Sequence, residues 1–292
     1  MAEPTDKILQ IEGLSVHFNA GKPSSHCALN DVSLSIAEGE VLGLVGESGS
    51  GKTVLSHSIL GLLPANGQIT GGRIKWKGQE IQNLSEKKLR PIRGKEIAMI
   101  FQDPQASLNP VYTVGKQLLW RLKLHRSLSG QTAKNEACKL LKSVQLPDPE
   151  RAYGCYAHEL SGGMAQRAMI AMALAGRPRL LIADESTSAL DATIQLEIVS
   201  LLKTIQRTHR MAILFITHNM NLINGFCSDV AVMQHGQIVE NAPTNLILSE
   251  PITVYTKRLL FASGLLQQNT NTEKLFSDKE SGEPIQSITS NH

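Results

Sequence analysis

A glycine-rich octapeptide, with an apolar run before it and a helical pattern after it, constrains this chain more than any other feature. The apolar run covers residues 41–45, and the octapeptide is Gly46-Glu47-Ser48-Gly49-Ser50-Gly51-Lys52-Thr53. Short continuous apolar runs are typical of buried parallel strands, and a helical pattern covers residues 52–63. The segment is therefore predicted to be a strand, a tight loop and a helix, the context in which G-x-x-x-x-G-K-[ST] binds phosphate.

The residue types of this phosphate loop (residues 46–53) indicate what it binds. Glycines let the backbone curve closely, so that consecutive N–H groups point inward at phosphate oxygens. We expect the ammonium of Lys52 to neutralise the β- and γ-phosphates of a nucleotide, and the hydroxyl of Thr53 to bind Mg²⁺. The residues assigned to nucleotide binding are Gly46, Ser48, Gly49, Ser50, Gly51, Lys52 and Thr53.

Other apolar segments indicate the fold class. Residues 8–11 and 32–36 alternate apolar and polar side chains, as edge or half-buried strands do. Continuous apolar runs, typical of buried strands, cover residues 97–100, 180–183 and 212–216. A helical pattern over residues 195–206 separates the last two runs. Because alternating strands and helices imply crossover connections, we predict an α/β fold with a parallel-sheet core.

The stretch from about residue 104 to residue 177 has no strand pattern. Helical patterns follow one another there, over residues 114–124, 132–144 and 162–174. We interpret this stretch as an α-helical subdomain inserted into a domain of residues 1–262. The remaining residues, 263–292, are mostly polar, bury too little apolar surface to fold alone and are predicted to form a disordered tail.

The composition argues against several functional classes. The 292 residues carry a net charge of +3, which is too small to indicate nucleic-acid binding. No apolar stretch reaches the roughly 18 residues that a membrane span requires, and the acidic start of the chain lacks the apolar core of a signal peptide. The four cysteines form no C-x-x-C pair, so we expect reduced structural thiols. If this protein acts at a membrane, we expect it to do so as a peripheral subunit.

Two adjacent carboxylates, Asp184 and Glu185, follow the apolar run at residues 180–183. Such a pair is costly at the end of a buried strand unless it serves a cation or a water molecule. We expect Asp184 to hold Mg²⁺, and Glu185 to act as the general base that polarises an attacking water. An ordinary acidic turn is the alternative, and the phosphate loop in the same chain argues against it.

Three other side chains are placed to join this site. Gln102 follows the run at residues 97–100, and its amide could contact Mg²⁺ or the water, although a surface position is commoner for such a residue. His218 follows the run at residues 212–216, at the strand end where ligands collect, and its ring could bond the γ-phosphate. We predict that none of the other eight histidines lies at the C-terminal end of a parallel strand. Phe18 could stack on adenine, with a place in the core as the alternative.

A second glycine turn lies about twenty residues before the acidic pair. This signature turn, Ser161-Gly162-Gly163-Met164, opens a helical pattern, and the first N–H groups of a helix have no partner within it. It is therefore a second place for phosphate oxygens. The two places could grip one nucleotide, or nucleotides shared between two subunits.

The order of these motifs resembles that of the ATP-binding-cassette (ABC) family of transport ATPases, over about residues 7–262. The matching motifs are Phe18, residues 46–53, Gln102, residues 160–163, Asp184-Glu185, residues 188–191 and Thr217-His218. The resemblance implies a P-loop NTPase fold with an antiparallel β edge, and ATP as the nucleotide. It also implies that the signature turn contacts an ATP held by the opposing subunit, and that Asp191 couples the two sites across the interface.

Met164 narrows the resemblance to one branch of the family, because most other members have Gln at this position. Residues 101–110, 169–175 and 254–260 are also similar to the branch that serves di- and oligopeptide and nickel importers. We therefore expect a peptide cargo, with nickel or another small cargo as the alternative.

Three departures from that branch bear on the choice. Ser186 stands where proline usually follows the catalytic Glu, so φ is less restricted at this turn. Thr253-Val254 stands where the peptide branch often has His-Pro. Many ATPases of the peptide branch also have a C-terminal extension with cysteines, whereas no cysteine follows Cys227 here. These departures weaken the peptide assignment relative to nickel or another small cargo and leave the expectation of ATP hydrolysis intact.

The resemblance also implies partners and a location. They are a second ABC ATPase subunit, identical or different, two membrane permease subunits and an extracytoplasmic substrate-binding protein. The chain would lie peripherally on the cytoplasmic face of the inner membrane, with residues 104–124 docked on a permease. An ABC ATPase of DNA repair or translation is a weaker alternative, because the chain has one cassette and no zinc-binding cysteine pairs. An adaptor cassette that does not hydrolyse ATP is disfavoured by the intact set Lys52, Asp184, Glu185 and His218.

Overall fold

The structure, a computed structural model, describes residues 7–186 and 190–266. Most of the predicted tail and residues 188 and 189 of one motif lie outside this part of the chain. The strands are β1 Lys7–Phe18, β2 His26–Ala37, β3 Val41–Val45, β4 Gly67–Trp76, β5 Gln79–Glu80, β6 Ile97–Ile100, β7 Leu180–Asp184, β8 Ala212–Thr217, β9 Asp229–Gln234 and β10 Gln237–Pro243. The α-helices are α1 Lys52–Leu60, α2 Glu86–Leu89, α3 Pro104–Ser107, α4 Val114–Arg126, α5 Gly130–Ser143, α6 Pro149–Gly154, α7 Gly162–Leu174, α8 Ala192–His209, α9 Thr244–Ser249 and α10 Val254–Ala262.

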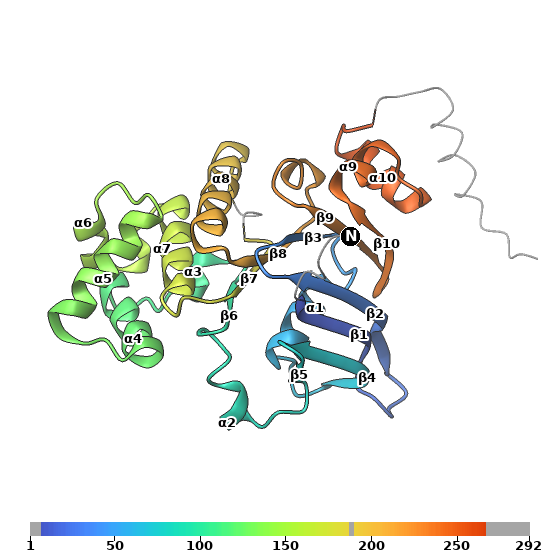
Figure 1. Cartoon of the computed structure of the whole chain (residues 1–292), viewed down its shortest axis with the longest axis horizontal. Helices are drawn as coiled ribbons and strands as arrows, with labels where there is room; N and C mark the ends of the chain where they lie inside the picture. Colours follow the sequence, from blue (N-terminus) through green and yellow to red (C-terminus); the bar gives the residue numbers. More distant parts are fainter. Residues whose placement is uncertain (1–6, 187–189, 267–292) are drawn as a thin grey trace, which may run out of the picture.

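The larger of two sheets has the strand order β10-β9-β3-β8-β7-β6 (Figure 1). Neighbours from β9 to β6 are parallel, and β10 pairs antiparallel with β9. Strands β3, β7 and β8 are buried along their whole length. This explains why they read as continuous apolar runs and not as alternating patterns. The predicted parallel-sheet core is confirmed.

The smaller sheet is antiparallel, with the order β2-β1-β4-β5. Because β1 pairs with β2 on one side and β4 on the other, residues 8–11 belong to an interior strand and not to an edge. The smaller sheet and α1 share one core with one face of the larger sheet, to which β3 contributes Leu42 and Leu44. This sheet is the antiparallel β edge that the resemblance implied.

Helices cover the other face of the larger sheet. There Val41 and Val45 of β3 join a second core, together with side chains of α4 to α8. Residues 104–177, every one of which the structure describes, form helices and no strand. Figure 1 shows α4 to α7 grouped beside the larger sheet, on the side away from the smaller one. The three helices predicted in this stretch correspond to α4, α5 and α7.

Helix α1 ends at Leu60, about three residues before the predicted end. The next residue, Gly61, has a left-handed φ of +60°. The N–H groups of Gly61 and Leu62 turn back to the carbonyl oxygens of Ser58 and His57, at 3.1 and 2.8 Å. This closing pattern is a common helix terminator, and glycine adopts it without a steric penalty.

Candidate nucleotide site

The phosphate loop connects β3 to α1, as predicted. Gly51 directly precedes α1 with a φ of +110°, and a Cβ there would lie 2.9 Å from a side-chain carbon of Leu29. A Cβ on Gly46 would collide with the carbonyl oxygen of Met233. Glycine is therefore required at both positions. Because Gly51 has no side chain that could cap α1, the first N–H groups of this helix stay available to a phosphate.

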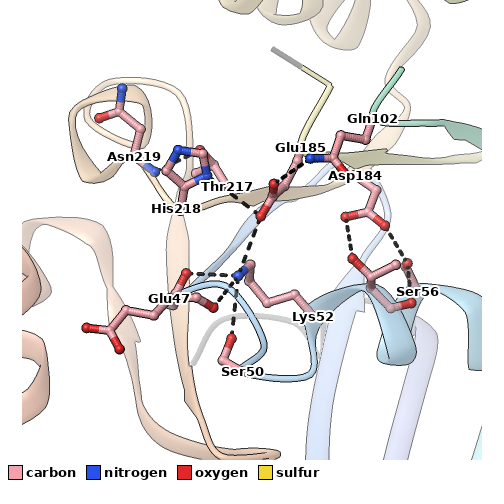
Figure 2. Close-up of polar contacts among 12 residues, drawn as sticks. Glu47, Ser50, Lys52, Ser56, Gln102, Asp184, Glu185, Thr217, His218 and Asn219 are labelled. Atoms are coloured by element: carbon pink, nitrogen blue, oxygen red, sulfur yellow. Dashed lines mark hydrogen bonds and ion pairs between the residues drawn. The ribbon is translucent and has the colours of Figure 1, made fainter. Parts of the chain in front are cut away.

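The ammonium of Lys52 lies inside the phosphate loop. Its Nζ donates to the carbonyl oxygens of Gly46 and Glu47, at 2.8 Å each, and lies 3.6 Å from Oε1 of Glu185 (Figure 2). The residue is only 4% exposed. Burial lowers the pKa of the Lys52 ammonium, and the carboxylate of Glu185 opposes this effect. A buried cation at a glycine loop is suited to bind the charged phosphates of a nucleotide.

Asp184 ends β7 and contacts the first residues of α1. Its carboxylate accepts hydrogen bonds from Ser56 Oγ at 3.0 Å and from Thr53 Oγ1 at 3.4 Å. Burial raises the pKa of Asp184, and the Ser56 hydrogen bond counteracts this effect. A carboxylate beside a hydroxyl fits Mg²⁺, which takes oxygen ligands and usually combines one or two carboxylates with substrate phosphates and water.

Glu185 is the point on which three elements converge. Its carboxylate accepts a hydrogen bond from Gln102 Nε2 at 3.2 Å and lies 3.7 Å from His218 Nδ1 (Figure 2). These partners come from the segments that follow β6 and β8. Glu185 itself has a φ of +43°, an uncommon value for a residue other than glycine, and its N–H donates to Ile216 O of β8. The structure thus brings Gln102, Glu185 and His218 together, as the sequence predicted.

A cleft of about 490 Å³ lies over Gln102 and Glu185, whereas His218 is not among its lining residues. The cleft is within the size range of small-ligand pockets. Its predicted lining residues are Phe18, Ser48, Gly49, Gly51, Lys52, Thr53, Gln102 and Glu185. Three other predicted residues, Gly46, Ser50 and Asp184, are buried and do not line it. Phe18 reaches the cleft from the end of β1, close to Gly67, where a Cβ would lie 3.0 Å from its ring. The placement of Phe18 is that expected of a residue which stacks on adenine.

The sequence analysis missed part of this lining. The missed residues are His26, Cys27, Ala28, Val54, His235 and Gly236. His26 reaches the cleft because it pairs with Phe18 across β1 and β2. His235 directly follows β9, which is parallel to β3. Our prediction that only His218 follows a parallel strand was therefore wrong, and the apolar run at residues 230–233 was the signal that could have shown it.

The signature turn opens α7, as predicted, but none of its residues lines the cleft. Ser161 is exposed and caps the helix, with its Oγ accepting the N–H of Met164 at 3.3 Å. The turn therefore lies outside the nucleotide cleft of its own chain.

The start of α8 is the neighbour of the signature turn. A Cβ on Gly162 would lie 3.4 Å from Leu190, and one on Gly163 would lie 3.3 Å from Ile194. Asp191 caps α8, with Oδ1 accepting the N–H of Ile194 at 3.0 Å. The signature turn and Asp191 are thus parts of one surface, where two helices begin.

Comparison with known proteins decides the family. The sequence profile described as ABC transporter matches residues 29–188. The chain belongs to the ABC transporter family. The dipeptide transport ATP-binding protein DppD of Escherichia coli (strain K12) is 45% identical over 255 residues, which cover 87% of this chain and 78% of that protein.

Solved structures of ABC cassettes share the fold. The dimeric post-hydrolysis state of the ATP-binding cassette MJ0796, bound to ADP and Pi, has a TM-score of 0.72 and 28% identity, and covers 81% of this chain and 98% of its own. CbiO1 from Clostridium perfringens, part of the ABC transporter complex cbiONQ, has a TM-score of 0.71 and 26% identity. The match covers 88% of this chain and 95% of CbiO1. This ABC protein is therefore a P-loop ATPase of the α/β class, as the motifs implied.

Proposed function

We propose that this chain is the ATP-binding and hydrolysing subunit of a binding-protein-dependent ABC importer for di- or oligopeptides. The observation that carries the catalytic part is the convergence of Lys52, Gln102 and Glu185 on one cleft. The peptide cargo is supported by the relatives, among which DppD of Escherichia coli is named a dipeptide transport ATP-binding protein.

The described contacts support roles for the predicted residues that line the cleft and for Asp184 and His218 beside it. Phe18 stacks on adenine, while the N–H groups of the phosphate loop and the Lys52 ammonium bind the phosphates. Thr53, Asp184 and Gln102 would hold Mg²⁺, which neutralises phosphate charge when bound. Glu185 takes a proton from the water that attacks the γ-phosphorus, so that the bond to the β-phosphate oxygen breaks and ADP leaves with inorganic phosphate. His218, beside Glu185, donates to the γ-phosphate.

The position of the signature turn supports a two-subunit reaction. Ser161 is exposed and lies outside the cleft of its own chain, so it is free to reach the ATP of a second cassette. In this arrangement Ser161, Gly162, Gly163 and Met164 close over the partner's γ-phosphate, and Asp191 couples the two sites. The second cassette is identical to this chain or a different one.

The remaining partners follow from an importer role. They are two membrane permease subunits, docked on residues 104–124, and an extracytoplasmic substrate-binding protein. Across residues 7–186 and 190–266 no helix is both long and apolar enough to cross a bilayer. We place the chain on the cytoplasmic face of the inner membrane, held there by the permeases.

Uptake and ATP hydrolysis test this function together. The assembled transporter is reconstituted with its binding protein, and uptake of a labelled dipeptide and of nickel is measured with wild-type chain and with Lys52→Ala. We expect ATP-dependent dipeptide uptake that Lys52→Ala abolishes. Nickel uptake without peptide uptake would assign the other cargo, and ATPase activity without any uptake would contradict the importer role.

A further inference from the structure

The phosphate loop is tied to a helix at the other end of the described chain. The N–H of Glu47 donates to the hydroxyl of Tyr255, with 2.9 Å between the two heavy atoms. Tyr255 belongs to α10 and is only 8% exposed. The two residues are 208 positions apart in sequence, so this bond closes the loop against a distant element.

The same peptide unit also contacts the phosphate-binding lysine. The N–H of Glu47 and the C=O of Gly46 belong to one planar peptide group. Lys52 Nζ donates to Gly46 O at 2.8 Å, while the N–H of the group points at Tyr255. The Gly46–Glu47 peptide is thus held at both ends, and the two hydrogen bonds polarise it in the same sense.

The start of α10, which carries Tyr255, is held by a buried carboxylate. Glu240 of β10 accepts hydrogen bonds from the N–H of Ile252 at 2.8 Å and from the N–H of Thr253 at 3.0 Å. It also accepts from the hydroxyls of Thr253 and Thr256, at 3.0 and 2.6 Å. These bonds fix the start of α10, and therefore the position from which the Tyr255 ring reaches the loop.

A second contact from the same region supports the loop elsewhere. The N–H of Gly236, in the turn between β9 and β10, donates to Ser50 O at 2.9 Å. The phosphate loop is therefore held by the C-terminal elements at its start and near its end.

We propose that Tyr255 is a positioning residue for the nucleotide, because it fixes the Gly46–Glu47 peptide against which Lys52 is aligned. When Lys52 turns to the phosphates, the carbonyl end of this peptide loses its cationic partner. The Tyr255 hydroxyl then keeps the peptide, and with it the curvature of the loop, in the phosphate-binding shape. This inference rests on the proposed ATP-binding function.

The test compares Tyr255→Phe, which removes one oxygen and keeps the ring, with Tyr153→Phe on α6, outside the cleft. The Kd for MgATP is measured by calorimetry on the full chain. KM and kcat for ATP hydrolysis are measured in the assembled transporter. For Tyr255→Phe we expect Kd and KM to rise roughly three- to ten-fold, the effect of losing one net hydrogen bond. We expect kcat to change less than about two-fold, because Glu185 keeps its partners, and Tyr153→Phe to leave all three constants unchanged.

Each outcome separates this inference from the function on which it rests. Unchanged Kd and KM in Tyr255→Phe, with normal binding by wild type, would overturn the role of Tyr255 alone. A fall in kcat together with a lower thermal midpoint would show a merely structural role and would also overturn it. Wild-type chain that binds MgATP no better than Lys52→Ala would contradict the proposed function itself.

Discussion

Lys52 and Glu185 form an ion pair across the nucleotide cleft, with Nζ of the lysine 3.6 Å from Oε1 of the glutamate. Both side chains are largely buried, with exposed fractions of 3% and 13%. The lysine that we propose to bind phosphate and the glutamate that we propose as the general base are therefore each other's ionic partners. Because the phosphates of ATP are also anionic, we expect them to compete with Glu185 for Lys52, so that the carboxylate can face the attacking water when ATP is bound.

Glu185→Gln tests this double role. The amide cannot accept the proton of water, so we expect ATP hydrolysis to fall by roughly 10²- to 10⁴-fold. Because the neutral side chain no longer competes for Lys52, ATP binding should be unchanged or tighter. With the partner cassette present, the variant should accumulate as an ATP-bound dimer, measured by size-exclusion chromatography. Normal turnover by Glu185→Gln would rule out the general-base assignment.

Ser161→Ala separates a structural effect from a catalytic one. Removing the capping hydroxyl of α7 should lower the free energy of unfolding by about 1 kcal/mol. It should also reduce ATP-dependent association with the partner cassette, because the contact to the partner's γ-phosphate is lost. Asp148→Ala is the matched control, since Asp148 caps α6 through the N–H of Arg151 at 3.0 Å and does not line the cleft. Equal ATP-dependent association of the two variants with the partner cassette would refute the proposed contact.

Gln166 on α7 is fully buried, and within the described residues neither polar atom of its side chain has a hydrogen-bond partner. A buried amide without partners costs about 1–3 kcal/mol, so Gln166→Met, which keeps a similar volume, should raise the free energy of unfolding by an amount of that order.

Gln117 on α4 provides the control for this substitution. It is also buried, but its amide accepts from Asn109 N at 3.0 Å and donates to Tyr112 O at 2.9 Å. Gln117→Met should therefore destabilise the chain by about 1–3 kcal/mol. Urea unfolding measures both variants, and a loss of stability in Gln166→Met would show that its amide has a partner in solution.

Glu240→Gln gives a pH-dependent prediction. Burial alone would raise the pKa of Glu240, but hydrogen bonds from Ile252, Thr256 and Thr253 outweigh it and lower the pKa. A lowered pKa means that the folded chain binds this proton less readily than the unfolded chain. The contribution to stability is therefore complete above about pH 4.3 and is lost as the pH falls through the lowered folded pKa.

At neutral pH we expect Glu240→Gln to be less stable than wild type by about 2 kcal/mol. The NH₂ group of the glutamine would replace one carboxylate oxygen and place a donor against a backbone N–H that is itself a donor. The difference should shrink as the pH falls below about 4.3, because the unfolded wild-type chain then binds a proton that the folded carboxylate does not yet bind. Urea unfolding at pH 7 and pH 3.5 measures this. A difference that does not change with pH would contradict the role of the ionised carboxylate.

The parts predicted best from the sequence are those whose signal is local. Strands β3 and β6 and helix α7 have the predicted bounds, because a strand buried on both faces is a continuous apolar run. The phosphate loop was predicted equally well, because its glycines are required by the local backbone, which has positive φ at Gly46, Gly49 and Gly51. By contrast β4 was not predicted, because only Ile74 and Trp76 of its ten residues are buried and Gly71-Gly72 interrupt any apolar pattern.

The parts that were missed depend on pairing between distant segments. His26 lines the cleft only because the register of β1 and β2, which contains bulges, places it opposite Phe18. Ser56 contacts Asp184, and Tyr255 contacts Glu47, across separations of 128 and 208 residues. No local pattern in either partner indicates such a contact. Ser186, noted for replacing a proline, proves to be buried, with no hydrogen-bond partner for its hydroxyl among the described residues.

The place of β3 in the larger sheet determines when this strand can fold during synthesis of the chain. Both of its neighbours, β8 and β9, come from residues 212–234, so β3 has no partner strand while the ribosome makes the intervening sequence. Non-local pairing of this kind is slow, and it leaves apolar segments exposed to chaperones in the meantime. We therefore expect a nascent or prematurely ended chain to lack a formed phosphate loop. Such fragments would take up no ATP and would not compete with finished subunits for a place in the transporter.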